Sequence, residues 1–130
     1  MLHNYITYSG HQIGDSHISK GMQCEDFSAD YIDEKMAIAV ISDGHGDKNC
    51  FRSAKGAEFA CTIAIEKVKE MFEDTEAFVT LKHSPDRVIT ELEKSIIHRW
   101  NQCVLDDVKS SPFTEEEYQG LDENVVITLR

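Results

Sequence analysis

The chain has 130 residues, of which 41% are hydrophobic, and this fits one domain with a modest core. Its 24 acidic residues outnumber its 13 basic ones, and the net charge of -11 opposes binding to the phosphate backbone of nucleic acids. No stretch approaches the roughly 18 apolar residues of a membrane span, and the N-terminus lacks the basic start and apolar run of a signal peptide. We therefore expect a cytoplasmic protein that binds neither nucleic acid nor membrane.

The first third of the chain predicts short strands. Residues 2–8 (LHNYITY) are rich in aromatic and β-branched residues, which favour a strand. Residues 26–32 alternate between apolar and polar, and residues 36–42 (MAIAVIS) form an almost continuous apolar run. The polar DEK between these two runs predicts a hairpin, although it lacks the glycine that tight hairpin turns favour.

The period of the apolar residues then changes from strand-like to helical. Steps of three and four residues predict an amphipathic helix at about residues 50–72, in which Gly56 indicates close packing. Residues 73–84 are expected to form a connector. Ser84 and Pro85 then provide an N-cap and a proline at the first helical position of a second helix, at about residues 85–109.

The end of the chain predicts one more strand, at residues 124–129, after a polar connector. A β-branched strand needs a partner, and no later segment supplies one. We therefore expect an unfinished sheet edge at 124–129 through which copies could self-associate. The predicted fold is α+β, with an antiparallel sheet packed on two long antiparallel helices. Residues 1–130 are expected to form a single but incomplete domain.

The candidate functional residues follow the second strand of the predicted hairpin, in the segment Asp43-Gly-His-Gly. A carboxylate at the end of an apolar strand is costly to bury unless it is paired with a cation or with hydrogen bonds. The hairpin would bring Glu25 and Asp26, which precede its first strand, to the same edge as Asp43. Hard oxygen ligands of this kind suit Mg²⁺ or Mn²⁺.

These residues carry a resemblance to a known family. The segment GMQCEDFSADYIDEKMAIAVISDGHGD resembles the amino-terminal metal-binding segment of the type 2C, metal-dependent protein serine/threonine phosphatases. That family has "ED" before a strand, then a hairpin, an apolar strand and "DGHGG". The upstream SHISKGMQCED is similar to the "SHxxxGxxCxD" of its bacterial branch. The resemblance implies a β-sandwich flanked by helices, of which this chain would be the amino-terminal half.

The resemblance also implies roles for individual residues. The enzyme would hydrolyse phosphomonoesters on a phosphorylated protein substrate with a metal-activated water and two Mg²⁺ or Mn²⁺ ions. Asp43 would bridge the two ions, the Gly44 carbonyl and Glu25 would bind one of them, and Asp26 would order its water. His45 would be the general acid for the leaving alkoxide.

Two departures from the family pattern stand out. Many relatives hold the substrate phosphate with an arginine where this chain has Gly21, so Lys20 and His17 become the candidates for weak phosphate binding. The later half of the family domain supplies the aspartates for the other ion, and three aspartates here do not sit in matching contexts: Asp106, Asp107 and Asp122.

Two classes of function therefore remain open from the sequence. The first is a 2C-type serine/threonine phosphatase, in which residues 1–130 alone would be nearly inactive. The alternative is a truncated, catalytically inactive phosphatase-like binding module. Metal-dependent turnover separates the two.

Overall fold

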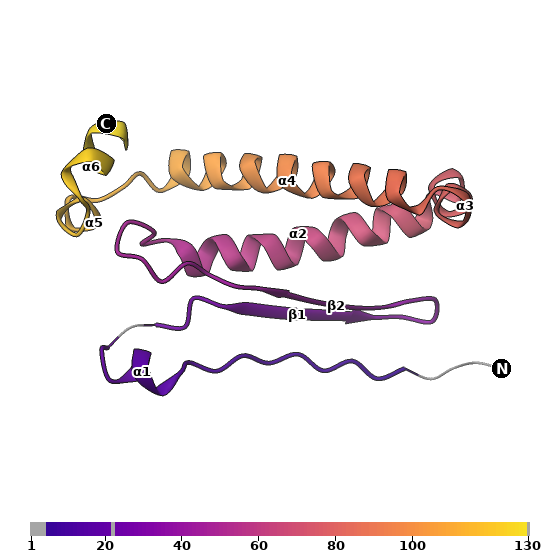
Figure 1. Cartoon of the computed structure of the whole chain (residues 1–130), viewed down its shortest axis with the longest axis horizontal. Coiled ribbons are helices and arrows are strands. Elements are labelled where there is room, and N and C mark those ends of the chain that lie inside the picture. The colour runs from indigo at the N-terminus through magenta and orange to yellow at the C-terminus, as the bar shows by residue number, and fades with distance from the viewer. Residues whose placement is uncertain (1–4, 22, 130) are drawn as a thin grey trace.

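The computed structural model describes residues 5–21 and 23–129, and within these the side chains of all residues except 16, 17 and 127–129. The fold is α+β, as the sequence predicted. Its elements in chain order are α1 (Asp15–Ile18), β1 (Phe27–Ile32), β2 (Ala37–Ser42), α2 (Ser53–Glu73), α3 (Thr75–His83), α4 (Pro85–Ser110), α5 (Glu115–Gln119) and α6 (Glu123–Leu129). Figure 1 shows three layers, with α2 between α4 and the β1–β2 hairpin.

The hairpin is antiparallel, and its register runs from Phe27 opposite Ser42 to Ile32 opposite Ala37. Its turn needs no glycine because Asp33 organises it. The Asp33 carboxylate accepts hydrogen bonds from the N–H groups of residues 35 and 36, at 2.7 and 2.8 Å. These bonds also lower the pKa of Asp33.

The strand predicted at residues 2–8 is not found in its described part, residues 5–8, while residues 1–4 lie outside the described residues. This segment runs alongside β1 (Figure 1), but it is attached by side chains. Thr7 and Ser9 donate hydroxyl hydrogen bonds to the Asp30 carboxylate, at 2.7 and 2.5 Å. The prediction was wrong because side-chain bonds here take the place of a backbone ladder.

The core is small and centres on α2. Its buried apolar side chains are Ile38, Ala57, Cys61, Ile63 and Val88. The Cys61 thiol donates to the backbone oxygen of Phe27 at 3.4 Å, and burial raises the pKa of this thiol. Helix α2 therefore holds the hairpin on one side and α4 on the other.

The two long helices were predicted correctly, and α4 begins at Pro85 as expected. They meet at Gly56, whose carbonyl accepts a 2.9 Å hydrogen bond from the indole N–H of Trp100. Ser84 occupies the N-cap position of α4, but its side chain makes no capping hydrogen bond. Among the described residues no helix is both long enough and apolar enough to cross a membrane.

The connector predicted at residues 73–84 is mostly helical, because α3 occupies residues 75–83. Asp74 caps it, since its carboxylate accepts hydrogen bonds from the N–H groups of Glu76 and Ala77, at 2.9 and 3.1 Å. The short helix turns the chain between α2 and α4 at one end of the molecule (Figure 1).

The strand predicted at residues 124–129 is wrong, because this segment belongs to helix α6. The carbonyl of Asp122 accepts hydrogen bonds from the N–H groups of Val125 and Val126 and so begins a helical turn. The strand propensity of β-branched residues is context-dependent. In the part of the chain that the structure describes, the sheet contains only β1 and β2, and neither pairs with this segment. The expected sheet edge is therefore absent from residues 124–129, and self-association through it has no structural basis.

Candidate catalytic turn and metal centre

The structure places the two acidic segments side by side. Phe27 pairs with Ser42 at the end of the hairpin ladder, so the residues just before β1 face those just after β2. The N–H of Gly44 donates a 3.1 Å hydrogen bond to Oδ1 of Asp26. Residues 43–46 are thus tied to the segment that carries Glu25 and Asp26; they are called here the catalytic turn, after the role that the sequence predicts for them.

Gly44 is packed against the backbone of Glu25. A Cβ atom built on Gly44 would lie 2.0 Å from the carbonyl oxygen of Glu25 and 2.5 Å from its carbonyl carbon. Those distances leave no room for any side chain. Glycine is therefore required here for the close approach of two backbones.

Glu25 has a buried carboxylate oxygen. Its Oε2 is shielded from solvent and makes no hydrogen bond within the described part of the chain. A buried carboxylate oxygen without a partner is costly, and a cation would relieve the cost. The Asp43 side chain, by contrast, belongs to an exposed residue at the end of β2.

The residues present fit Mg²⁺ or Mn²⁺ in the type of their donors. Carboxylate and carbonyl oxygens are available from Glu25, Asp43 and Gly44, and such hard donors suit these ions. The number of donors is smaller than a complete site needs. Across residues 5–21 and 23–129, no group of three His, Cys, Asp or Glu side chains is arranged to hold a metal ion.

The catalytic turn is also joined to the start of α2. The backbone N–H of His45 donates a 2.5 Å hydrogen bond to the hydroxyl of Ser53, the first residue of that helix. The residue His45 itself is exposed. Its main chain is therefore fixed while its imidazole remains accessible to a ligand.

An open, mostly apolar cavity of about 480 Å³ lies beside the catalytic turn. Asp43, Gly44 and His45 line one part of it, and the facing sides of α2 and α4 line the rest, including Trp100 and Val104. The turn therefore presents its polar groups at the edge of a hollow surface.

The whole sequence was compared with models of known protein families. A family model described as protein phosphatase 2C matches residues 13–125. The chain belongs to the protein phosphatase 2C family. Comparisons with curated proteins and with solved structures gave no significant match. The region matched by the phosphatase 2C model includes the hairpin, the catalytic turn, both long helices and the start of α6.

The candidate phosphate-binding residues of this phosphatase 2C chain lie before the hairpin. Lys20 is exposed in the turn after α1, which ends at Gly21 with a positive φ of 67°. His17 belongs to α1, and its side chain lies outside the part of the chain that the structure describes. Their role in holding phosphate stays a prediction.

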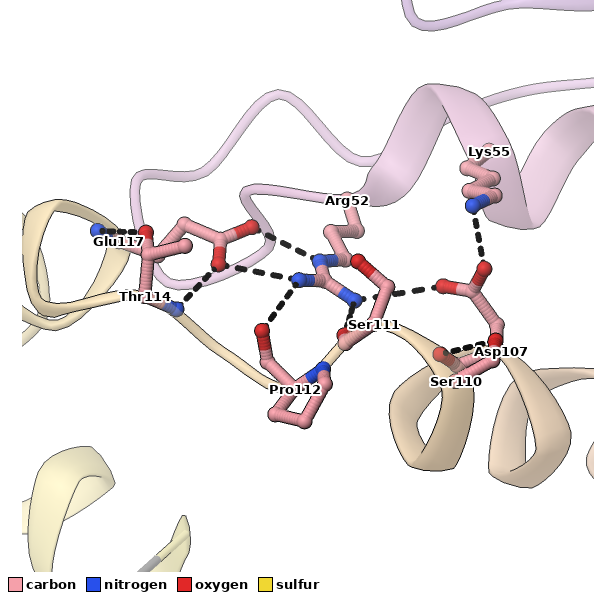
Figure 2. Close-up of polar contacts among 8 residues, drawn as sticks. All are labelled: Arg52, Lys55, Asp107, Ser110, Ser111, Pro112, Thr114 and Glu117. Atoms are coloured by element: carbon pink, nitrogen blue, oxygen red, sulfur yellow. Dashed lines mark hydrogen bonds and ion pairs between the residues drawn. The ribbon is translucent and has the colours of Figure 1, made fainter.

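Arg52 is a residue whose role the sequence did not predict. It precedes α2, and Figure 2 shows its guanidinium between the end of α4 and α5. Both its Nε and one Nη bind the Glu117 carboxylate, at 2.8 and 3.0 Å, and the remaining bonds go to the Asp107 carboxylate and to the carbonyls of Ser111 and Pro112. All five N–H groups of the side chain are therefore used.

This arrangement, called here the Arg52 clamp, has two consequences. Arg52 chiefly, and the N–H of Thr114 next, lower the pKa of Glu117 to about 2. A guanidinium with every donor engaged cannot also bind a substrate phosphate, so Arg52 does not replace the arginine that many phosphatase 2C relatives use. Sequence gave no signal for the clamp, because its acidic partners lie 55 and 65 residues away among many other acids.

Asp122 is also engaged in a contact with the loop after the catalytic turn. Its carboxylate pairs with the Lys48 ammonium and accepts a 3.0 Å hydrogen bond from the Asn49 side chain. Its backbone N–H donates to the Asn49 side-chain oxygen, also at 3.0 Å. The hydrogen bonds that the Asp122 carboxylate accepts, first from Lys48 and then from Asn49, lower its pKa.

Proposed function

We propose that this chain serves a phosphoprotein phosphatase that hydrolyses phosphoserine or phosphothreonine with Mg²⁺ or Mn²⁺. Membership of the phosphatase 2C family supports the reaction class. The observation that carries the proposal to particular residues is the buried oxygen of Glu25, which has no hydrogen-bond partner among the described residues and lies beside the tightly packed Gly44. Such a site would act on phosphorylated proteins in the cytoplasm.

Each of these residues would have a separate role in the reaction. Glu25, Asp43 and the carbonyl of Gly44 would hold the metal. When bound, Mg²⁺ or Mn²⁺ supplies Lewis acidity and lowers the pKa of water. Asp26 accepts the N–H of Gly44 and so orients the Gly44 peptide. The accessible imidazole of His45 would donate a proton to the oxygen that leaves phosphorus.

The site has no arginine at the position where many relatives bind the substrate phosphate. In place of an arginine, Lys20 and His17 would supply positive charge to the substrate phosphate. A lysine ammonium attracts phosphate as a point charge and lacks the two-pronged geometry of arginine. We therefore expect a high KM for small phosphomonoesters.

A second function has one observation in its favour. No three ligating side chains gather around one point within the described residues. A binding module that holds a phosphorylated protein without turnover would need no complete metal site. In that case the catalytic turn would serve recognition only.

The test is hydrolysis of nitrophenyl phosphate and of a phosphothreonine peptide, with and without Mn²⁺, by the protein as expressed from its own gene. We expect Mn²⁺-dependent turnover that Asp43→Asn abolishes, because Asp43 would be one of the residues that hold the metal. His45→Ala should lower kcat less, by about 10²–10⁴-fold, since it removes only leaving-group protonation. Residues 1–130 alone should be nearly inactive.

The outcomes discriminate between the two functions. Full activity of Asp43→Asn would contradict the phosphatase assignment. Peptide binding without any turnover, unchanged by Mn²⁺, would favour the binding module. Strong Mn²⁺-dependent turnover by residues 1–130 alone would show that the ligands present here are sufficient.

A further inference from the structure

The hydroxyl of Ser53 bonds to a segment outside its own helix. Ser53 is the first residue of α2, and the N-cap position before it is Arg52, whose side chain makes no capping bond. The hydroxyl of Ser53 accepts a 2.5 Å hydrogen bond from the backbone N–H of His45, eight residues earlier.

The position of Ser53 is fixed from the other side by the Arg52 clamp. Arg52 directly precedes Ser53, and its guanidinium binds Glu117 on α5 and the chain at the end of α4. The ring of Phe113 stacks on the guanidinium, whose central carbon lies 4.8 Å from the ring centroid. The start of α2 is therefore attached to a corner that is more than 50 residues away in sequence.

A second set of contacts joins this region to the end of the chain. The loop after the catalytic turn is bound at Asn49 to Asp122 by two hydrogen bonds of 3.0 Å. The catalytic turn is thus bordered by Asp26 on its hairpin side and by Ser53 on its helix side. Of these contacts, which all join described residues, the one with Ser53 reaches the backbone of His45.

We propose that Ser53 is a positioning residue for the phosphatase reaction, and that its hydroxyl sets the place of the His45 backbone within the catalytic turn. This inference rests on the proposed function of that turn. The Arg52 clamp determines where Ser53 lies, and Ser53 determines where His45 lies. A shift of about 1 Å in such a group is enough to lower a rate by about 10²-fold.

The first experiment removes the hydroxyl and then restores it, in the protein as expressed from its own gene. Ser53→Ala should lower kcat for nitrophenyl phosphate with Mn²⁺ by about 10–100-fold and leave KM within about threefold. Ser53→Thr keeps a hydroxyl on Cβ and should recover most of the rate. The control is Ser110→Ala, which removes a hydroxyl bonded to the Asp107 carbonyl at the end of α4 and should have no effect.

The second experiment does not depend on activity. Amide hydrogen exchange by NMR on residues 1–130 should show His45 exchanging about tenfold faster in Ser53→Ala than in the wild type or in Ser53→Thr. The amide of Gly44, held by Asp26, provides an internal reference in the same spectrum. Equal exchange of His45 in all three proteins would overturn the contact itself.

The two experiments separate the inference from the proposed function. An inactive wild-type protein would refute the proposed function, and with it the positioning role, while exchange still tests the Ser53–His45 contact. An active wild type whose kcat is unchanged in Ser53→Ala would refute the positioning role alone. Loss of activity in both Ser53→Ala and Ser53→Thr would also refute it, because the hydroxyl would not be what matters.

Discussion

At the scale of single residues, Gly44 is where the two acidic segments come closest. Its missing side chain lets the backbone of Glu25 approach, and the N–H of Gly44 is then in reach of Asp26. The hairpin explains this contact, because its register places the residues before its first strand beside those after its second.

Gly44→Ala should be strongly destabilising. The added Cβ would collide with backbone atoms of Glu25, which cannot rotate away as a side chain can. We expect a loss of about 3 kcal/mol in the free energy of unfolding, measured by urea denaturation. Gly14→Ala is the matched control, since a Cβ there meets nothing within 4 Å, and it should change stability by less than about 0.5 kcal/mol. Equal stability of the two variants would contradict the packing described here.

Glu117 should make the fold sensitive to acid. Its pKa is about 2 in the folded chain against an ordinary value of 4.5. A group with a lowered folded pKa stabilises the fold above its unfolded pKa, and this contribution is lost as pH falls through its folded pKa. Glu117→Gln should therefore destabilise the chain at pH 7 by about 1–2 kcal/mol, a value reduced by partial exposure of the pair. The difference from wild type in urea denaturation should shrink between about pH 5 and pH 2. A constant difference across that range would refute the ion pair.

At the scale of elements, two helices differ in whether a side chain caps their first turn. Asp74 accepts two N–H groups at the start of α3, while Ser84 makes no capping bond at the start of α4. Asp74→Ala should cost about 1 kcal/mol in unfolding free energy and increase hydrogen exchange across α3. Ser84→Ala should change stability by less than about 0.5 kcal/mol. A larger loss in Ser84→Ala than in Asp74→Ala would reverse this ranking.

Sequence predicted some elements well for identifiable reasons. The hairpin and the two long helices were predicted from local apolar periodicity, which depends on neighbouring residues alone. The strands predicted at 2–8 and 124–129 depended on partners elsewhere in the fold. Side-chain bonds to Asp30 and a helical turn started at Asp122 decided those segments instead.

The candidate site divides in the same way. The positions of Asp43 and the Glu25-Asp26 pair could be predicted because each lies next to a strand end, while their role as a shared metal site stays a prediction. The contacts of Arg52 could not be predicted, because its partners come from distant segments. A basic residue in a sequence does not indicate which acidic residue it will pair with. The role of Ser53 was missed because its bond to the His45 backbone depends on how the catalytic turn folds back onto the start of α2.

At the scale of the whole molecule, the chain exposes a large surface. Its accessible area is 9738 Å², whereas a compact protein of 14.8 kDa exposes roughly 7,000 Å². The excess includes apolar side chains such as Ile6 and Ile41, which are 95% and 86% exposed. The fold is therefore held by little burial for its length.

This surface predicts a low stability for residues 1–130. We expect a free energy of unfolding at or below about 5 kcal/mol, the lower end of the usual range. Urea denaturation followed by circular dichroism gives the value, and binding of a hydrophobic dye to the folded chain gives an independent measure of the exposed apolar surface. A cooperative transition with a free energy above about 10 kcal/mol would contradict this estimate.

The bond between Trp100 and Gly56 gives the molecule its own optical probe. Trp100 is the only tryptophan in the chain, so the indole emission comes from one place. That indole both joins α4 to α2 and lines the cavity beside Asp43 and His45. Separation of the two helices would expose it to water and shift its emission to the red, while an apolar group entering the cavity would shift it to the blue. Intrinsic fluorescence thus reports the opening and the filling of the same hollow without any label.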